Sequence, residues 1–150
     1  MQTEVKYPGT FSIYKKTGAA QFTLMMPRVN DKGRIDKNGA VLLEVASSSG
    51  EKSYDWQTKI SFAIGMSDLS NIMESPDSPA KLIHTTPNSN SIKSLEFIPG
   101  EGKYVGTFMM KISEKSGDDK WRNISVPLSS GEYTVLLRLL MSAAPTIIGW

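Results

Sequence analysis

The chain has 150 residues, of which 39% are hydrophobic and 21% charged, and this size and composition indicate one domain spanning residues 1–150. It contains no cysteine, which excludes disulfides, a thiolate zinc site and a cysteine nucleophile. Because His84 is the single histidine, neither a Ser-His-Asp triad nor a multi-histidine metal site is expected. We therefore predict no enzymatic activity, no catalytic residues, no metal and no other cofactor.

The net charge of +2 is too small to predict a nucleic-acid ligand on its own. Its distribution is more informative, because residues 1–40 carry seven basic and three acidic side chains, whereas residues 41–150 carry ten basic and twelve acidic ones. The positive charge is thus weighted toward the N-terminal third. The one long apolar stretch, Tyr133–Trp150, is interrupted by Arg138 and Pro145, so we expect a buried helix and no membrane association.

The first half of the chain predicts four strands and a short helix. The strands are expected over Gly18–Met26, Lys32–Ile35, Ala40–Ala46 and Lys59–Ile64. Asp36–Gly39 is interpreted as a tight hairpin turn, because Asn-Gly accepts the positive φ angles that such turns need. Ser67 is expected to cap a helix over Asp68–Met73. Residues 1–12 precede these elements and are expected to form a flexible N-terminal arm.

The second half predicts an antiparallel meander followed by a long helix. Its four strands are expected over Ala80–Thr85, Ile92–Ile98, Tyr104–Ile112 and Trp121–Val126. Ser129 and Glu132 match a capping box that opens the helix, and Pro145 is expected to kink or end it near Ala144. Four apolar side chains at helical spacing are expected to pack on the sheets and on partner chains: Leu136, Leu139, Leu140 and Ala143. The predicted fold class is α+β.

A basic and aromatic segment at the entry to the first strand suggests contact with a phosphate backbone. Tyr14 is followed by Lys15 and Lys16, whose ammonium groups can neutralise phosphates. The small residues Gly18–Ala20 would let that backbone approach the sheet closely. The alternative is a solvated strand entry with no ligand.

Two tryptophans suggest base stacking. Trp56 precedes the strand that begins at Lys59, and Trp121 stands beside Arg122 at the start of another strand. Exposed aromatic rings beside cations can stack unpaired bases and hold their phosphates. The alternative is that both rings belong to the core, which is the usual place of tryptophan.

Other motifs carry less chemistry. Gly100–Lys103 lacks the spacing of a phosphate-binding loop and is interpreted as a turn. His84 lies in a predicted strand beside Thr85, and a hydrogen-bonded structural histidine is favoured there over a catalytic one.

Several motifs resemble the Whirly family when they are taken in order. Asp36–Gly39 leads into an apolar strand, a Ser/Gly loop and the Y-D-W motif Tyr54–Trp56, as in that family. The end Pro145–Trp150 is similar to the family's P-x-x-x-G-W ending, and the resemblance spans roughly residues 13–150. The segment Lys16–Ala20 is similar to the family's K-G-K-A-A-L signature, although it reads K-T-G-A-A and its second lysine has no evident counterpart.

The resemblance implies two four-stranded antiparallel sheets packed across each other, as in PC4-like proteins, with a short helix after the fourth strand and a long C-terminal helix. It also implies a homotetramer that binds single-stranded DNA with little sequence preference, and RNA in several members. No small-molecule substrate is implied. The expected phosphate contacts are Lys15, Lys16, Arg28 and Lys37, the stacking rings are Tyr14, Trp56 and Trp121, and the secondary contacts are Lys59, Lys111 and Arg122.

The predicted function is therefore coating or protection of single-stranded DNA in replication, recombination, repair or transcription. Two alternatives stay open: an RNA-binding or annealing factor of the guide-RNA-binding type, and an oligomeric protein-interaction module. The expected location is cytoplasmic or nucleoid-associated in a microbe or virus, or organellar if the chain is the processed form of a longer protein.

Overall fold

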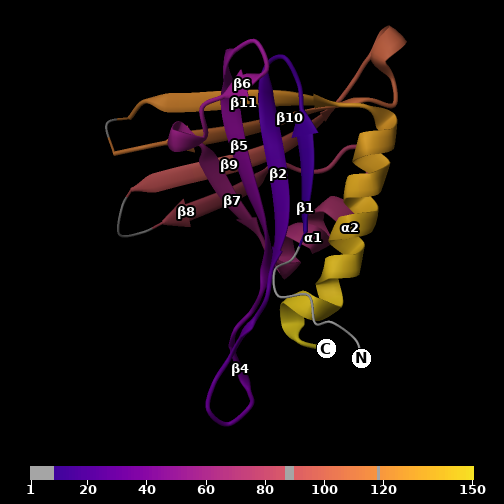
Figure 1. The fold of residues 1–150 in the computed structure, drawn as a ribbon. Helices are drawn as coiled ribbons and strands as arrows, with labels where there is room; N and C mark the ends of the chain where they lie inside the picture. The colour runs from indigo at the N-terminus through magenta and orange to yellow at the C-terminus, as the bar shows by residue number, and fades with distance from the viewer. Residues whose placement is uncertain (1–8, 87–89, 118) are drawn as a thin grey trace, which may run out of the picture.

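Two antiparallel sheets cross each other, and both helices lie beside the first sheet in the computed structural model (Figure 1). The structure describes residues 9–86, 90–117 and 119–150. In the first sheet β1 pairs with β2 and β2 with β5, while β6 and β7 both pair with β5. These strands are β1 (Thr10–Tyr14), β2 (Gly18–Met25), β5 (Ala40–Gly50), β6 (Ser53–Tyr54) and β7 (Ile60–Ile64).

The second sheet is a meander in the order β11-β10-β9-β8. Its strands are β8 (Leu82–Thr86), β9 (Ser91–Pro99), β10 (Phe108–Lys115) and β11 (Trp121–Leu128). The helices are α1 (Met66–Glu74) and α2 (Ser130–Ile148), with short 3-10 turns η1 (Trp56–Thr58) and η2 (Gly102–Tyr104). The α+β class, the crossed sheets and the long C-terminal helix are confirmed.

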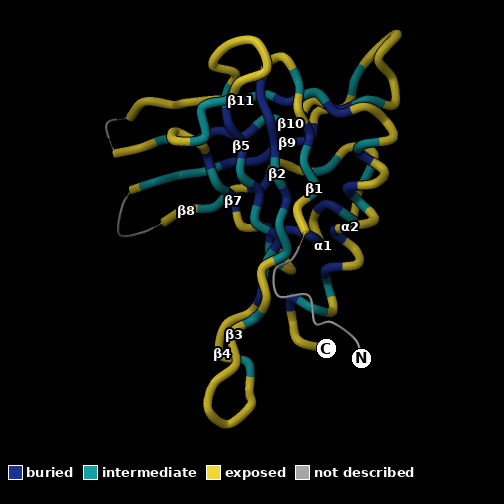
Figure 2. Tube along the Cα trace, viewed as in Figure 1, coloured by how far each residue is buried: buried dark blue, intermediate teal, exposed yellow. Residues whose placement is uncertain are grey.

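The core fills the space where the sheets and α2 meet, as the dark segments of Figure 2 show. Alternate residues of β2 and β5 point inward, which is why Phe22 and Leu43 are buried while Gln21 and Glu44 are only half-buried. The second sheet contributes Met110 and Ile112 among others, and α2 contributes one buried stripe. That stripe consists of Tyr133, Leu136, Leu140, Ala143 and Ile147.

The two sheets are in close contact at the start of β2. A Cβ atom on Gly18 would lie 3.1 Å from Cγ2 of Ile124 in β11 of the second sheet, and 2.8 Å from the carbonyl oxygen of Ala46 in β5, the neighbouring strand of the same sheet. Beside it, the Thr17 hydroxyl donates a 2.6 Å hydrogen bond to the carbonyl of Ser125. The small residues Gly18–Ala20 are buried and make room for the second sheet. This corrects the interpretation that they admit a phosphate backbone.

The long hairpin of β2 and β5 reverses farther out than predicted. Beyond these strands the chain continues as β3 (Arg28–Val29) paired with β4 (Ile35–Lys37), and the reversal lies at residues 30–34, where Gly33 has φ +75°. The predicted strand Lys32–Ile35 and the predicted turn at Asp36–Gly39 are therefore wrong. Gly39 is required for close approach rather than for a turn, because a Cβ there would lie 2.3 Å from the carbonyl oxygen of Met25.

Other element boundaries also differ from the prediction, most clearly those of α1, β10 and β5. Helix α1 begins after Gly65 rather than Ser67, and the carboxylate of Asp68 accepts the Gly65 N–H at 2.9 Å. Strand β10 begins four residues later than predicted, because the 3-10 turn η2 and Gly106, at φ +94°, precede it. Strand β5 continues to Gly50 and so includes part of the Ser/Gly loop that was expected before Tyr54.

Pro145 does not end the long helix. Helix α2 continues through it to Ile148 and closes at Gly149 in the left-handed conformation, where the Trp150 N–H donates to the Pro145 carbonyl at 2.8 Å. Ile147 is completely buried, and this packing favours continuing the helix beyond the proline.

The predicted N-terminal arm lies only partly within the described residues. Residues 1–8 fall outside them, and residues 10–12 belong to β1, where Ser12 pairs with Gln21 of β2. Neither described helix has both the length and the apolar character needed to cross a membrane.

Replacing Gly18 with alanine tests the sheet crossing. We expect Gly18→Ala to lower the free energy of unfolding by about 1–3 kcal/mol, because the methyl group would crowd Ile124 across the crossing as well as the Ala46 carbonyl of the neighbouring strand. Urea unfolding measures this loss. The matched control is Gly117→Ala, which meets no atom within 4 Å and is expected to change stability by less than about 0.5 kcal/mol. Equal effects at both positions would contradict the account of the crossing.

Candidate nucleic-acid interface

An exposed hollow brings together aromatic and basic side chains at one end of the first sheet. The β1–β2 turn contributes Tyr14, Lys15 and Lys16, and the β5–β6 hairpin contributes Lys52 and Tyr54. We call these five residues the Tyr-Lys hollow. The lining also includes Ser48, Gly50 and the acidic Glu51, and the volume of the whole hollow is about 760 Å³. Two sequence segments that are nearly 40 residues apart therefore form one surface.

The two tyrosines of the hollow differ in their contacts and exposure. Their ring centroids are 5.7 Å apart with planes inclined at 40°. The Tyr54 hydroxyl donates a 2.7 Å hydrogen bond to the carbonyl of Lys15, which ties the β5–β6 hairpin to the β1–β2 turn. Tyr14 is 58% exposed, so its ring face is accessible to a stacking partner.

The three lysines of the hollow also differ. Lys15 Nζ lies 2.8 Å from Oε1 of Glu132 in the first turn of α2. Lys16 and Lys52 are exposed, and within the described residues neither forms an ion pair. Lys15 therefore serves the fold, whereas Lys16 and Lys52 present free charge.

The carboxylate partner of Lys15 completes the predicted capping box of α2. Glu132 Oε1 accepts the Ser129 N–H at 2.8 Å, and the Ser129 hydroxyl accepts the Glu132 N–H at 3.1 Å. Burial alone would raise the pKa of Glu132, but the hydrogen bonds from Lys15 and Ser129 outweigh it and lower the pKa below its ordinary value.

The other predicted phosphate contacts, Arg28 and Lys37, lie elsewhere. Both belong to the β3–β4 extension, which leaves the far end of the β2–β5 ladder from the hollow. Eight ladder residues at about 3.4 Å each separate the two ends by about 24 Å. The structure thus divides the predicted phosphate contacts into two groups.

The remaining predicted contacts do not line the hollow either. Trp56 is half-buried in η1, and Lys59 forms an ion pair with Glu44 on the outer face of the first sheet. On the second sheet, Lys111 is half-buried and Trp121 is 49% exposed. Arg122 Nη2 lies 3.9 Å from Oε1 of Glu114.

Sequence reasoning missed two members of the hollow. Lys52 lies in the expected Ser/Gly loop, and Tyr54 belongs to the Y-D-W motif, in which only Trp56 was predicted to stack. The polar residues between Gly50 and Ser53 were a sequence signal for a turn, and in the structure Lys52 adopts φ +56° there. This turn makes a short hairpin, which places Tyr54 beside the end of β5.

The single histidine has a structural environment. His84 Nε2 lies 2.9 Å from the Asp68 carboxylate, and its ring stacks on Phe62 at 3.9 Å between centroids. This contact joins β8 to α1, as the structural interpretation predicted. In the described part of the chain, no three His, Cys, Asp or Glu side chains gather into a metal-binding group.

The predicted subunit contacts are mostly inside one chain. Leu136, Leu140 and Ala143 are at most 5% exposed and pack in the chain's own core, so as placed they offer no outer surface. Leu139 is 46% exposed, and Val135, one helical turn before it, is 47% exposed. We call Val135 and Leu139 the ridge of α2. A groove beside this ridge is lined by apolar residues of β1, β2 and α2, including Phe11, Leu24 and Leu139.

By its fold the chain belongs to the class of α+β domains in which two antiparallel sheets cross and a long C-terminal helix packs beside them. A family model described as "Whirly transcription factor" matches residues 13–139. The chain belongs to the Whirly family.

Curated relatives and solved structures agree with this assignment. The chain is 27% identical over 154 aligned residues to the mitochondrial single-stranded DNA-binding protein WHY2 of Arabidopsis thaliana, covering 93% of this chain and 63% of that protein. It is 24% identical to the chloroplastic single-stranded DNA-binding protein WHY1 of Solanum tuberosum, covering 93% of this chain and 54% of that protein. The chain thus spans less than two thirds of the length of these relatives.

Two solved structures have the same fold. The crystal structure of WHY1 from Arabidopsis thaliana matches with a TM-score of 0.84 and 22% identity, covering 98% of this chain and 94% of the other. The plant transcriptional regulator PBF-2 matches with a TM-score of 0.85 and 22% identity, covering 98% and 86%.

The Lys15–Glu132 pair generates a pH prediction. Because the folded-state pKa of Glu132 is lowered, its stabilising contribution is present above the unfolded value of about 4.5 and is lost as pH falls through the folded pKa. We expect Glu132→Gln to unfold with a weaker pH dependence than the parent between about pH 5 and pH 2. Urea unfolding across this range measures the difference. Parallel pH profiles would mean that the pair does not stabilise the charged carboxylate.

Proposed function

We propose that the protein binds single-stranded DNA with little sequence preference and has no catalytic activity of its own. The observation that carries this proposal is the Tyr-Lys hollow, in which exposed Tyr14 stands beside the ammonium groups of Lys16 and Lys52, neither of which pairs with a carboxylate in the described part of the chain. The names of the plant relatives support it, because they are single-stranded DNA-binding proteins.

The chemistry of the hollow explains why the sequence preference would be small. Lys16 and Lys52 would neutralise phosphates, which every nucleotide carries. A base would stack on the Tyr14 ring, and every base has a face that can stack. Trp56 and Trp121 remain secondary stacking candidates, and the remaining secondary cations are Lys59, Lys111 and Arg122. The proposed role is coating or protecting single strands in replication, recombination, repair or transcription.

The family relationship and the apolar ridge on α2 support self-association into a tetramer. Val135 and Leu139 are nearly half exposed on one helix face, beside the groove that reaches Phe11. Burying this ridge against further copies of the chain would remove apolar surface from water.

The compartment is proposed as one that holds DNA. The relatives are mitochondrial or chloroplastic by name. The expectation of a cytoplasmic or nucleoid-associated protein, or of an organellar one if the chain is processed, stays a prediction.

Binding to labelled dT30, measured by fluorescence anisotropy at about 150 mM salt, tests the function. We expect tight binding that unlabelled duplex DNA displaces poorly. Tyr14→Ala should weaken it by about 1–3 kcal/mol through loss of stacking, whereas Tyr14→Phe, which keeps the ring, should bind like the parent. Equal displacement by duplex, or equal affinities of both variants, would contradict the proposal. Tighter binding to RNA would favour the RNA-binding alternative.

A charged substitution on the ridge tests the assembly. Leu139→Asp should convert the tetramer into smaller species in sedimentation velocity, because a carboxylate would be buried between chains. The control is Val105→Asp, at an apolar side chain that is 75% exposed and lies on the loop after η2, outside α2. A parent chain that sediments as a monomer would contradict the tetramer.

A further inference from the structure

The β3–β4 hairpin is a basic projection at the end of the first sheet farthest from the Tyr-Lys hollow. We call residues 28–37 the arm, which leaves the body of the molecule in Figure 1 and is largely exposed in Figure 2. The arm carries four cations and two acids: Arg28, Lys32, Arg34, Lys37, Asp31 and Asp36. Its net charge of +2 equals that of the whole chain.

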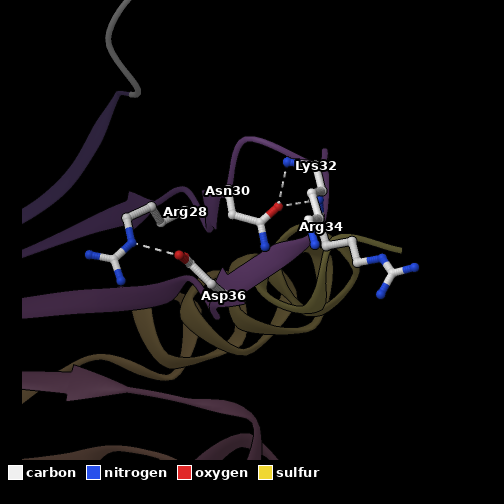
Figure 3. A network of polar contacts seen from close by, with 5 residues as sticks. All are labelled: Arg28, Asn30, Lys32, Arg34 and Asp36. Carbon is white, nitrogen blue, oxygen red and sulfur yellow. Dashed lines mark hydrogen bonds and ion pairs between the residues drawn. The ribbon is translucent and has the colours of Figure 1, made fainter.

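Among the residues that the structure describes, one of the four arm cations has an ion-pair partner and three have none. Arg28 Nε donates to Oδ1 of Asp36 at 2.9 Å. Lys32, Arg34 and Lys37 form no ion pair with any residue that the structure describes. Figure 3 shows the Arg34 guanidinium directed away from the Arg28–Asp36 pair.

The tip of the arm has a defined shape that does not depend on these cations. Asn30 Oδ1 accepts the backbone N–H groups of Lys32 at 2.9 Å and Arg34 at 3.0 Å (Figure 3). The Asn30 N–H donates to the Arg34 carbonyl at 2.8 Å, and Gly33 supplies the left-handed residue that the turn needs. The side chains of Lys32 and Arg34 are therefore free for a ligand.

The base of the arm is held by the end of α2. The Gly39 N–H donates to the Ile147 carbonyl at 2.8 Å. Ile35 packs where a side chain at Gly149 would stand, since a Cβ there would lie 1.8 Å from Ile35 Cδ1. The base of the arm is thus held against the last turn of α2.

We propose that the arm is a second phosphate-contacting surface for the same nucleic-acid strand, formed by Lys32, Arg34 and Lys37. The inference rests on the proposed function and deepens it. Residues 28–37 include no aromatic side chain, so the arm would neutralise phosphates without stacking bases. It lies about 40 Å from the hollow, counting ladder and arm residues at about 3.4 Å each, so only a long strand reaches both surfaces.

The double variant Lys32→Ala/Arg34→Ala tests the arm while keeping the Asn30 turn. If each cation contacts one phosphate, the slope of log affinity against log salt for dT30 becomes less negative by about 1.4, and binding at about 150 mM salt weakens about tenfold. The matched control is Lys81→Ala/Lys103→Ala, which removes two charges elsewhere. Lys81 pairs with Glu96, and Lys103 lies over the Tyr104 ring. We expect the control to bind within about twofold of the parent.

A short oligonucleotide distinguishes binding at the hollow from binding that also needs the arm. A dT6 strand carries five phosphates, and even when it is extended these are too few to bridge the hollow and the arm. The arm variant should therefore weaken dT30 binding but leave dT6 binding at low salt within about twofold of the parent. An unchanged dT30 affinity, an equal loss in the control, or an equal loss for dT6 would overturn the proposal. A parent chain that fails to bind dT30 at all would instead overturn the proposed function.

Discussion

The close crossing of the two sheets at Gly18 is the constraint on which the rest of the structure depends. With no side chain at that position, β11 can lie across the start of β2, and Thr17 hydrogen-bonds to Ser125. This contact closes the core between the sheets and fixes the β1–β2 turn just before it. This turn carries Lys16, and the end of β1 just before it carries Tyr14. The surface that we propose for nucleic acid is therefore positioned by the packing of a glycine.

Helix α2 connects both ends of the first sheet. At its first turn, Glu132 holds Lys15 beside the hollow. At its last turn, Ile147 and Gly149 hold the base of the arm. One helix thus fixes two basic surfaces that lie at opposite ends of the β2–β5 ladder. Its buried stripe serves the chain's own core, and the exposed Leu139 ridge is the part left for other subunits.

Local signals in the sequence predicted much of the fold. The alternation around Phe22 identified β2, and Ser129 with Glu132 identified the start of α2, because each signal acts within a few residues. Non-local packing decided what was missed. Asn38-Gly39 has the composition of a turn, yet Gly39 is needed for close approach to Met25. The site was only partly predictable, because Tyr54 meets Tyr14 through a pairing of strands distant in sequence.

Hydrogen–deuterium exchange with and without dT30 tests most directly that nucleic acid binds at the ends of the β2–β5 ladder. The account predicts slower exchange on binding in residues 14–17, 50–54 and 28–37, and little change in β8, which lies at the far edge of the second sheet. Protection confined to β8 and β9, with none in the Tyr-Lys hollow, would contradict it.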